Sequence, residues 1–278
     1  MLVYRGMDIG TAKPTAAERA LVPHHLVDVA DPSEDWSVAR SQELARAAVR
    51  DIEARGRRAL LVGGTGLYVQ AALDDLTLPG EDLALRAELE GWTSQPGGML
   101  AAYHELQRDD PVAAERIDEH NQRRIVRALE VMRSTGKPFS SFGPGMFRYG
   151  KTVFPVTLVG VWLPRDVLSR RIAERFEGMR AAGLVDEVRG LSGDGRLSRT
   201  AAQAIGYKEV LAALAGESTI DDALDLAQRR TRSFARRQRM WFRRDPRITW
   251  LAAPENPQVL APALLALWAA PTRTAQIA

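Results

Sequence analysis

The sequence predicts an α/β protein in which a parallel sheet forms the core and a block of helices is inserted into it. Three observations support this class. Short apolar runs typical of strands recur along the chain, amphipathic stretches lie between them, and strand signals are absent from residues 81–144. Strands that alternate with helices usually pair in parallel. The strand-like runs are residues 25–29, 59–62, 153–162 and 248–251.

The first core segment, residues 1–80, contains one helix whose ends are visible in the sequence. Ser37 is suited to cap its amino end, apolar residues follow at helical spacing, and Gly56 is suited to end it. The chain then runs into Gly-Gly-Thr-Gly at residues 63–66. Glycines there would let the backbone approach a ligand and Thr65 would offer a hydroxyl, whereas a plain tight turn is the alternative.

Residues 81–144 are interpreted as a helical insertion. A Pro-Gly pair precedes them and a Gly-Pro-Gly run marks the return to the core. Arg123 and Arg127 are four residues apart and so share one face of a helix, where they can follow phosphates. The alternative is a solvated face whose arginines pair with Glu130 and Asp118. We predict helices at residues 83–92, 99–107, 112–117 and 122–134.

The second core segment, residues 145–255, carries two arginine-bearing helices. The first, at residues 168–179, contains Arg175, for which an ion pair with Glu174 or Glu177 is the structural alternative to a ligand.

The second helix has eight arginines between residues 228 and 244, and apolar residues face the other way on its helical wheel. A phosphate backbone would suit such a stripe, although acidic residues at 221–225 offer pairing within the chain. Residues 256–278 are expected to form a C-terminal helix and a tail. The predicted phosphate contacts are Arg232, Arg236, Arg239 and Arg243.

Composition excludes several classes of function. The 278 residues carry a formal charge of +3 and no cysteine, so a disulfide framework, a thiolate zinc site and a cysteine nucleophile are ruled out. No stretch approaches the roughly 18 apolar residues of a membrane span. We expect a cytoplasmic monomer that does not bind a membrane and has no metal ligands of its own in this chain.

Several short motifs follow one another in a fixed order. They are Asp-Ile-Gly-Thr-Ala-Lys-Pro at 8–14, Val-Pro-His-His-Leu-Val-Asp at 22–28, Trp-Ser-Val-Ala at 36–39, Leu-Val-Gly-Gly-Thr-Gly-Leu-Tyr at 61–68, Arg-Arg-Ile-Val-Arg-Ala-Leu-Glu-Val at 123–131, Thr-Gly-Lys-Pro at 135–138, Gln-Ala-Ile-Gly-Tyr-Lys at 203–208, Arg-Gln at 237–238 and Trp-Phe-Arg at 241–243. Over nearly the whole chain this series resembles the tRNA dimethylallyltransferase, or tRNA isopentenyltransferase, family.

The resemblance implies a core like that of P-loop nucleoside triphosphatases, with its first strands missing from this chain, and a helical insertion that binds tRNA. It implies transfer of a dimethylallyl group from dimethylallyl diphosphate to N6 of the adenine next to the anticodon, in the anticodon stem-loop. Arg175 matches a family arginine near the diphosphate, where a guanidinium would stabilise the leaving group. The residues that match family tRNA contacts are Met1, Leu2, Thr65, Arg86, Arg123, Arg124, Ile125, Val126 and Arg127.

In the family, the diphosphate is held by a Gly-x4-Gly-Lys-Ser/Thr loop whose hydroxyl binds Mg2+. We expect no such loop in this chain, so Mg2+, the cofactor that the resemblance implies, would lack that ligand here. The family's general-base aspartate is also expected to be absent, because its place would come before Met1. We hypothesise a truncated form of a normal enzyme, with its start assigned at an internal methionine, and expect no appreciable transferase activity from it.

Two other functions fit parts of the sequence. An adenylate isopentenyltransferase would use a free nucleotide and need little basic surface, so the helical insertion and the arginine stripe argue against it. A catalytically inactive RNA-binding paralogue would keep the arginine surfaces and bind tRNA without turnover.

Overall fold

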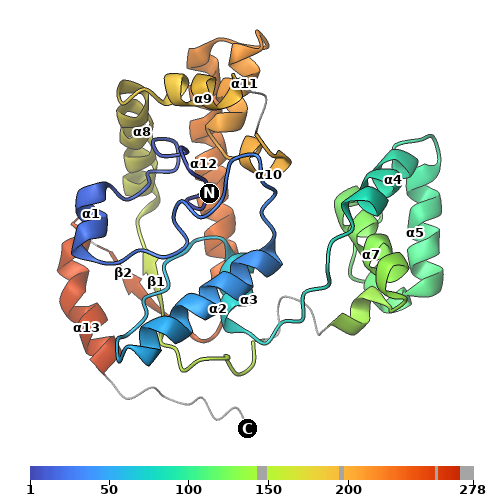
Figure 1. Ribbon diagram of the computed structural model, residues 1–278, viewed down its shortest axis with the longest axis horizontal. Helices are drawn as coiled ribbons and strands as arrows, with labels where there is room; N and C mark the ends of the chain where they lie inside the picture. The colour runs from blue at the N-terminus through green and yellow to red at the C-terminus, as the bar shows by residue number, and fades with distance from the viewer. Residues whose placement is uncertain (143–148, 194–196, 254–255, 270–278) are drawn as a thin grey trace. The chain divides into compact units, whose positions relative to one another are not determined.

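The computed structural model describes residues 1–142, 149–193, 197–253 and 256–269. The chain forms two compact units, both visible in Figure 1. Unit 1 comprises Met1–Ala72 and Phe154–Ala278, and unit 2 comprises Leu73–Val153. Because both ends of unit 2 join unit 1, unit 2 is an insertion into the sequence of unit 1.

Unit 1 combines a small parallel sheet with many helices. Strand β1 (Leu158–Trp162) pairs in parallel with β2 (Ile248–Ala252), and Leu158 lies opposite Ile248. The helices are α1 (Ala16–Leu21), α2 (Val38–Ala54), α3 (Gly66–Leu73), which ends at the boundary with unit 2, α8 (Arg165–Ala181), α9 (Leu184–Ser192), α10 (Arg199–Ala202), α11 (Tyr207–Leu214), α12 (Ile220–Phe242), the 3-10 helix η2 (Pro257–Leu260) and α13 (Ala261–Ala269).

The β1–β2 pair confirms two of the four predicted strands, the first over only the end of its run. The strand predicted at residues 59–62 is wrong. Leu60, Leu61 and Val62 are exposed coil, because no strand in the described part of the chain lies beside them to complete their backbone hydrogen bonds.

The strand predicted at residues 25–29 is also wrong. Leu26 and Asp28 have positive φ angles, 60° and 57°, which an extended strand does not allow. The Asp28 carboxylate is held by Lys13 and Arg19. Side-chain contacts therefore shape this loop, and the nearby ladder is reduced to a single parallel bridge between Tyr4 and Ala30.

Helix α2 confirms the local signals at both of its ends. Ser37 accepts a hydrogen bond from the Arg40 N–H, and Gly56 takes the left-handed conformation with φ 67°. Side chains of α2 also satisfy the last carbonyls of α3, since Gln42 and Arg46 both donate to the Ala71 oxygen. These bonds fix α3 against α2.

The core of unit 1 forms around two buried tyrosines from distant parts of the chain. Tyr4 and Tyr207 pack with Phe176 of α8 and Leu184 of α9. Tyr4 and Tyr207 are both fully buried. The amino-terminal loop is thereby part of the same core as α8, α9 and α11.

Unit 2 is helical throughout its core. The four predicted helices of the insertion are confirmed, with shifts of a few residues at their ends, and their core includes Leu89, Leu106, Ile125 and Leu129. The elements are α4 (Leu83–Thr93), α5 (Gly98–Asp109), α6 (Pro111–Ala114), α7 (Gln122–Thr135) and the 3-10 helix η1 (Phe139–Phe142).

Helix α12 runs for 23 residues, from its cap at Thr219 onward. Leu224 and Ala227 are buried on its core side, which confirms the predicted apolar face. The predicted terminal helix is also confirmed as α13, whereas the predicted tail at residues 270–278 lies outside the described residues.

Candidate functional site

A groove of about 680 Å³ lies in unit 1, between the loop at residues 8–16 and helix α8. The loop carries the Asp-Ile-Gly-Thr-Ala-Lys-Pro motif. Helix α8 lines the other side with Arg175, Gly178 and Met179. The groove therefore joins the amino-terminal motif to the helix that the sequence assigned to the diphosphate.

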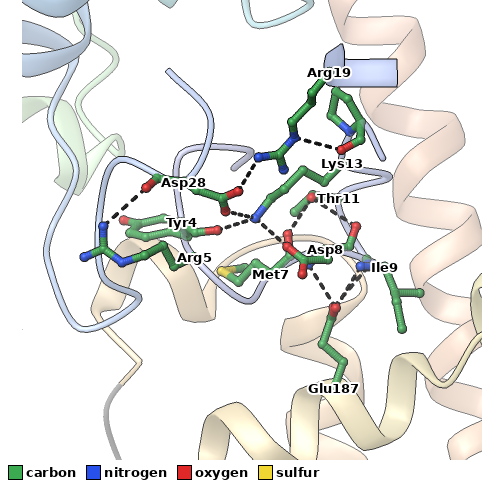
Figure 2. Close-up of polar contacts among 12 residues, drawn as sticks. Tyr4, Arg5, Met7, Asp8, Ile9, Thr11, Lys13, Arg19, Asp28 and Glu187 are labelled. Atoms are coloured by element: carbon green, nitrogen blue, oxygen red, sulfur yellow. Dashed lines mark hydrogen bonds and ion pairs between the residues drawn. The ribbon is translucent and has the colours of Figure 1, made fainter. Parts of the chain in front are cut away.

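Lys13 is the buried charge at the centre of the loop (Figure 2). Its Nζ lies 2.6 Å from Asp8 Oδ1 and 2.5 Å from Asp28 Oδ1, and it donates to the Tyr4 carbonyl at 2.6 Å. Arg19 donates to the other oxygen of Asp28 at 2.7 Å. Lys13 and Arg19 are thus held in place by Asp28 beside the groove.

The two cations also set the ionisation of Asp28. Partial burial by itself raises the pKa of this carboxyl, but the hydrogen bonds and charges of Lys13 and Arg19 outweigh it and hold the pKa below its usual value. Asp28 is therefore the permanent counter-ion of the pair.

Arg175 is the cation of the groove that remains available. Neither Glu174 nor Glu177 pairs with it, and it has no polar partner among the residues that the structure describes. Burial lowers the pKa of the Arg175 guanidinium, which nevertheless stays charged. A planar fork with free donors suits two oxygens of a phosphate or diphosphate.

Glu187 anchors the backbone of the loop. No motif in the sequence around Glu187 indicated this role. Its carboxylate accepts hydrogen bonds from the backbone N–H groups of Asp8, Ile9 and Gly10. The Tyr207 hydroxyl donates to the same carboxylate. These contacts join residues up to 179 positions apart.

The Gly-Gly-Thr-Gly loop at residues 63–66 packs against helix α12. A Cβ on Gly64 would overlap the Gln238 amide, and a Cβ on Gly66 would overlap the Trp241 ring. Gly64 and Gly66 therefore allow the side chains of Gln238 and Trp241 to pack directly against the backbone of this loop. Thr65 is exposed at the start of α3, where its carbonyl accepts the first hydrogen bonds of the helix.

In unit 2, Arg86 and Arg127 converge on one buried carboxylate. Glu130 is fully buried and accepts two hydrogen bonds from Arg86 and one from Arg127. Arg127 also donates to the carbonyls of Pro79 and Gly80. Both arginines thus fix the entry of the chain into unit 2.

The other predicted tRNA contacts of α7 fall on two different faces. The side chains of Arg123 and Arg124 are exposed and have no polar partner among the described residues. Ile125 and Val126 are buried in the core of unit 2. One face of the first turn of α7 carries the two arginines and is exposed to solvent. The opposite face carries the two apolar residues and belongs to the same core as Leu89 and Leu106.

On helix α12 the arginine stripe is mostly exposed. Arg236, and Arg243 at the carboxyl-terminal cap of the helix, are exposed and unpaired among the described residues. Arg232 is half-buried, and the Arg239 guanidinium lies over the Trp162 ring. At the start of the chain, Met1 and Leu2 are both partly exposed.

The expectation that the chain lacks a Gly-x4-Gly-Lys-Ser/Thr pattern is wrong, because residues 145–152 read Gly-Met-Phe-Arg-Tyr-Gly-Lys-Thr. Residues 145–148 lie outside the described residues. Thr152 forms an antiparallel bridge with Asp74, and no helix follows before α8. A phosphate loop lies between a strand and the first turn of a helix, so this match lacks the required context and we assign no phosphate to it.

The residues of the groove do not offer a magnesium site. Asp8 is the one carboxylate among the described residues that line it, and it is paired with Lys13. Nowhere in the described ranges do three or more His, Cys, Asp or Glu side chains form a group that could hold a metal ion. Mg2+ thus stays a prediction of the resemblance.

Comparisons with known proteins define the class. The family model for IPP transferases matches residues 2–245. A tRNA dimethylallyltransferase of Kineococcus radiotolerans is 52% identical over 257 residues, which cover 92% of this chain and 80% of the relative. The chain belongs to the IPP transferase family.

Solved structures agree with this assignment. The tRNA isopentenylpyrophosphate transferase of Bacillus halodurans is 41% identical, has a TM-score of 0.63, and is matched over 90% of this chain and 78% of that one. A eukaryotic dimethylallyltransferase acting on tRNA is 23% identical with a TM-score of 0.74, over 99% of this chain and 73% of that one, and supports the fold. The predicted fold class is therefore confirmed. Within the described residues, no helix is both long and apolar enough to cross a membrane.

Proposed function

We propose that this protein, in the form that its source cells make, modifies tRNA by transferring a dimethylallyl group from dimethylallyl diphosphate to N6 of the adenine next to the anticodon. The expectation that the 278-residue chain alone has no appreciable activity stays a prediction. The observation that carries the proposal is the 52% identity, over 92% of the chain, to a protein named tRNA dimethylallyltransferase. Identity at this level over nearly the whole chain supports a common reaction in addition to a common fold.

The reaction makes one bond and breaks one. The amine nitrogen of adenine attacks the allylic carbon, the carbon–oxygen bond to the diphosphate breaks, and the diphosphate leaves with the electron pair. The proton that the amine loses passes to water. We assign Arg175 to the diphosphate, because it lines the groove and its guanidinium has no polar partner among the described residues. A cation placed there would stabilise the negative charge that grows on the leaving group.

The tRNA would be held at exposed arginines in each unit. In unit 2 the candidates are Arg123 and Arg124, and in unit 1 they are Arg236 and Arg243. Because none of the four guanidinium groups has a polar partner within the described residues, each can donate to a phosphate. Thr65, Met1 and Leu2 are accessible and stay proposed contacts, whereas Arg86 and Arg127 are proposed to act through the chain entry that they fix.

The acceptor tests this function against its alternatives. Protein purified from its source cells is incubated with labelled dimethylallyl diphosphate and equal amounts of AMP and an anticodon stem-loop with adenine at the target position. We expect label on the stem-loop alone. Label on AMP would favour an adenylate isopentenyltransferase, and tight RNA binding without transfer would favour the inactive RNA-binding alternative.

Matched variants test the tRNA surface in unit 2. Replacing Arg123 and Arg124 together by glutamine should weaken binding to the stem-loop about tenfold or more, since two phosphate contacts are lost. Arg116→Gln is the control, because Arg116 is also exposed and unpaired in the described part of unit 2 but lies outside the matched motif. Equal losses in the variant and the control would contradict a specific surface.

A further inference from the structure

Three successive backbone N–H groups of the amino-terminal motif point at one carboxylate. Glu187 Oε2 accepts from Asp8 at 2.9 Å and from Ile9 at 2.7 Å, and Oε1 accepts from Gly10 at 3.2 Å. Figure 2 shows Glu187 reaching the loop from α9. Hydrogen bonds to an ionised acceptor are among the strongest in proteins, so this carboxylate is a firm anchor for the loop.

Tyr207 completes the anchor from α11. Its hydroxyl donates to Glu187, and its ring occupies the space that a Cβ on Gly10 would need. Tyr207 is fully buried. Burial, together with the hydrogen bond to Glu187 and its negative charge, raises the pKa of the Tyr207 hydroxyl, so the hydroxyl stays protonated and remains a donor.

The anchored segment is the wall of the groove opposite Arg175. Asp8, Ile9 and Lys13 line the groove on the loop side, whereas Glu187 and Tyr207 do not line it. The loop is closed on itself by the Lys13 N–H, which donates to the Asp8 carbonyl. A shift at residues 8–10 therefore moves Lys13 and changes the distance across the groove to Arg175.

We propose that Glu187, held by Tyr207, is a positioning residue that sets the groove for its diphosphate. It touches no ligand itself and acts through the loop at residues 8–13. The proposal rests on the proposed function in one respect, namely that the groove binds a diphosphate. The anchoring of the loop is a separate property of the folded chain and is measurable without a ligand.

Two readouts on the full chain test the proposal. The first is amide hydrogen exchange at residues 8–10, and the second is the affinity for inorganic pyrophosphate measured by calorimetry. In Glu187→Gln we expect exchange at these three amides to accelerate at least about tenfold and the affinity for pyrophosphate to fall at least about tenfold, because the charged acceptor is lost. Tyr207→Phe keeps the ring and should show smaller changes of the same kind.

Asp186→Asn is the matched control. Asp186 is the neighbouring carboxylate on α9, but it is exposed and pairs with Arg189 instead of the loop. It should leave both readouts unchanged. The melting temperature of each variant is measured first, and both readouts are then taken well below it. Under these conditions every variant is folded, so a change in either readout reports loss of the anchor and not loss of the fold.

The outcomes separate this inference from the proposed function. Equal pyrophosphate affinity in the wild type and Glu187→Gln would overturn the positioning role. If the wild type binds no pyrophosphate, the assignment of the groove to a diphosphate is wrong, and the positioning role is wrong with it. The anchor would still be established if the three amides are protected in the wild type and lose that protection in Glu187→Gln. Free exchange of these amides in the wild type would overturn the anchor itself.

Discussion

Glu130 is a buried carboxylate that gives two arginines a structural role. It is fully buried, and Arg86 and Arg127 both donate to it. Burial by itself raises the pKa of Glu130, but the hydrogen bond from Arg86, followed by those from the Asp82 N–H and Arg127, outweighs it and holds the pKa below its usual value. Glu130 therefore remains charged, and the three side chains act as one structural group.

Neutralising this carboxylate should destabilise unit 2. In Glu130→Gln, two partly buried guanidinium groups lose their counter-ion, and we expect the free energy of unfolding to fall by about 3 kcal/mol. Urea denaturation followed by circular dichroism measures this. Glu119→Gln is the control, because Glu119 is exposed and, among the described residues, pairs only with His120; an equal loss of stability in the control would show that Glu130 has no special role.

The same group predicts a dependence on pH. Because the pKa of Glu130 is lower in the folded than in the unfolded chain, its contribution to stability is complete above the unfolded value of about 4.3 and is lost as the pH falls through the folded value. The difference in unfolding free energy between wild type and Glu130→Gln should be constant above about pH 5.5 and shrink below about pH 4. A difference that grows on acidification would contradict this assignment.

At the scale of elements, α12 serves two purposes on opposite faces. Leu224 and Ala227 are buried in the core of unit 1, while Arg236 and Arg243 are exposed. Near its end, Trp241 fits against Gly66 at the start of α3. The helix thus connects the packing of the Gly-Gly-Thr-Gly loop to the proposed RNA surface.

Adding one methyl group at Gly66 should disturb this packing. A Cβ there overlaps the Trp241 ring, and overpacking of this kind costs about 1–3 kcal/mol. We expect Gly66→Ala to lower the melting temperature. Gly91→Ala in α4 is the matched control, since nothing lies within 4 Å of its added Cβ and alanine favours a helix; a lower melting temperature there as well would show that the contact is not the cause.

The exposed arginines of α12 should appear in the salt dependence of RNA binding. Each arginine that contacts a phosphate contributes close to one unit to the slope of log affinity against log salt concentration. Replacing Arg236 and Arg243 by glutamine should make that slope less steep, with a decrease of about 1.5 in its magnitude. Arg50→Gln, at an exposed arginine of α2, should not change it, and an unchanged slope in the double variant would remove α12 from the interface.

At the scale of the whole molecule, the sequence predicted what neighbouring residues determine. Ser37 and Gly56 lie next to the helix that they bound, and the helices of unit 2 follow from apolar spacing. The contact of Glu187 with Asp8 spans 179 positions, so no local pattern reveals it. The run at residues 59–62 has the composition of a strand, but a strand also needs a partner, which composition cannot supply.

The candidate site was predictable in the same uneven way. The motif match directed attention to Arg175, which lines the groove and has no polar partner in the described part of the chain. It did not separate Arg123 from Arg127, because the sequence left pairing with Glu130 open as an alternative for these arginines, and the structure shows it for Arg127. Residues 145–152 show the converse case, a sequence pattern that no helix follows in the described residues 153–164.

Locating the product on tRNA tests the proposed dimethylallyl transfer. Protein purified from its source cells is incubated with dimethylallyl diphosphate and a tRNA that has adenine next to the anticodon, and the RNA fragments are analysed by tandem mass spectrometry. We expect the mass of one dimethylallyl group on that adenine and no added mass on a tRNA with guanine at that position. Unmodified adenine in tRNA that the folded protein binds would contradict it.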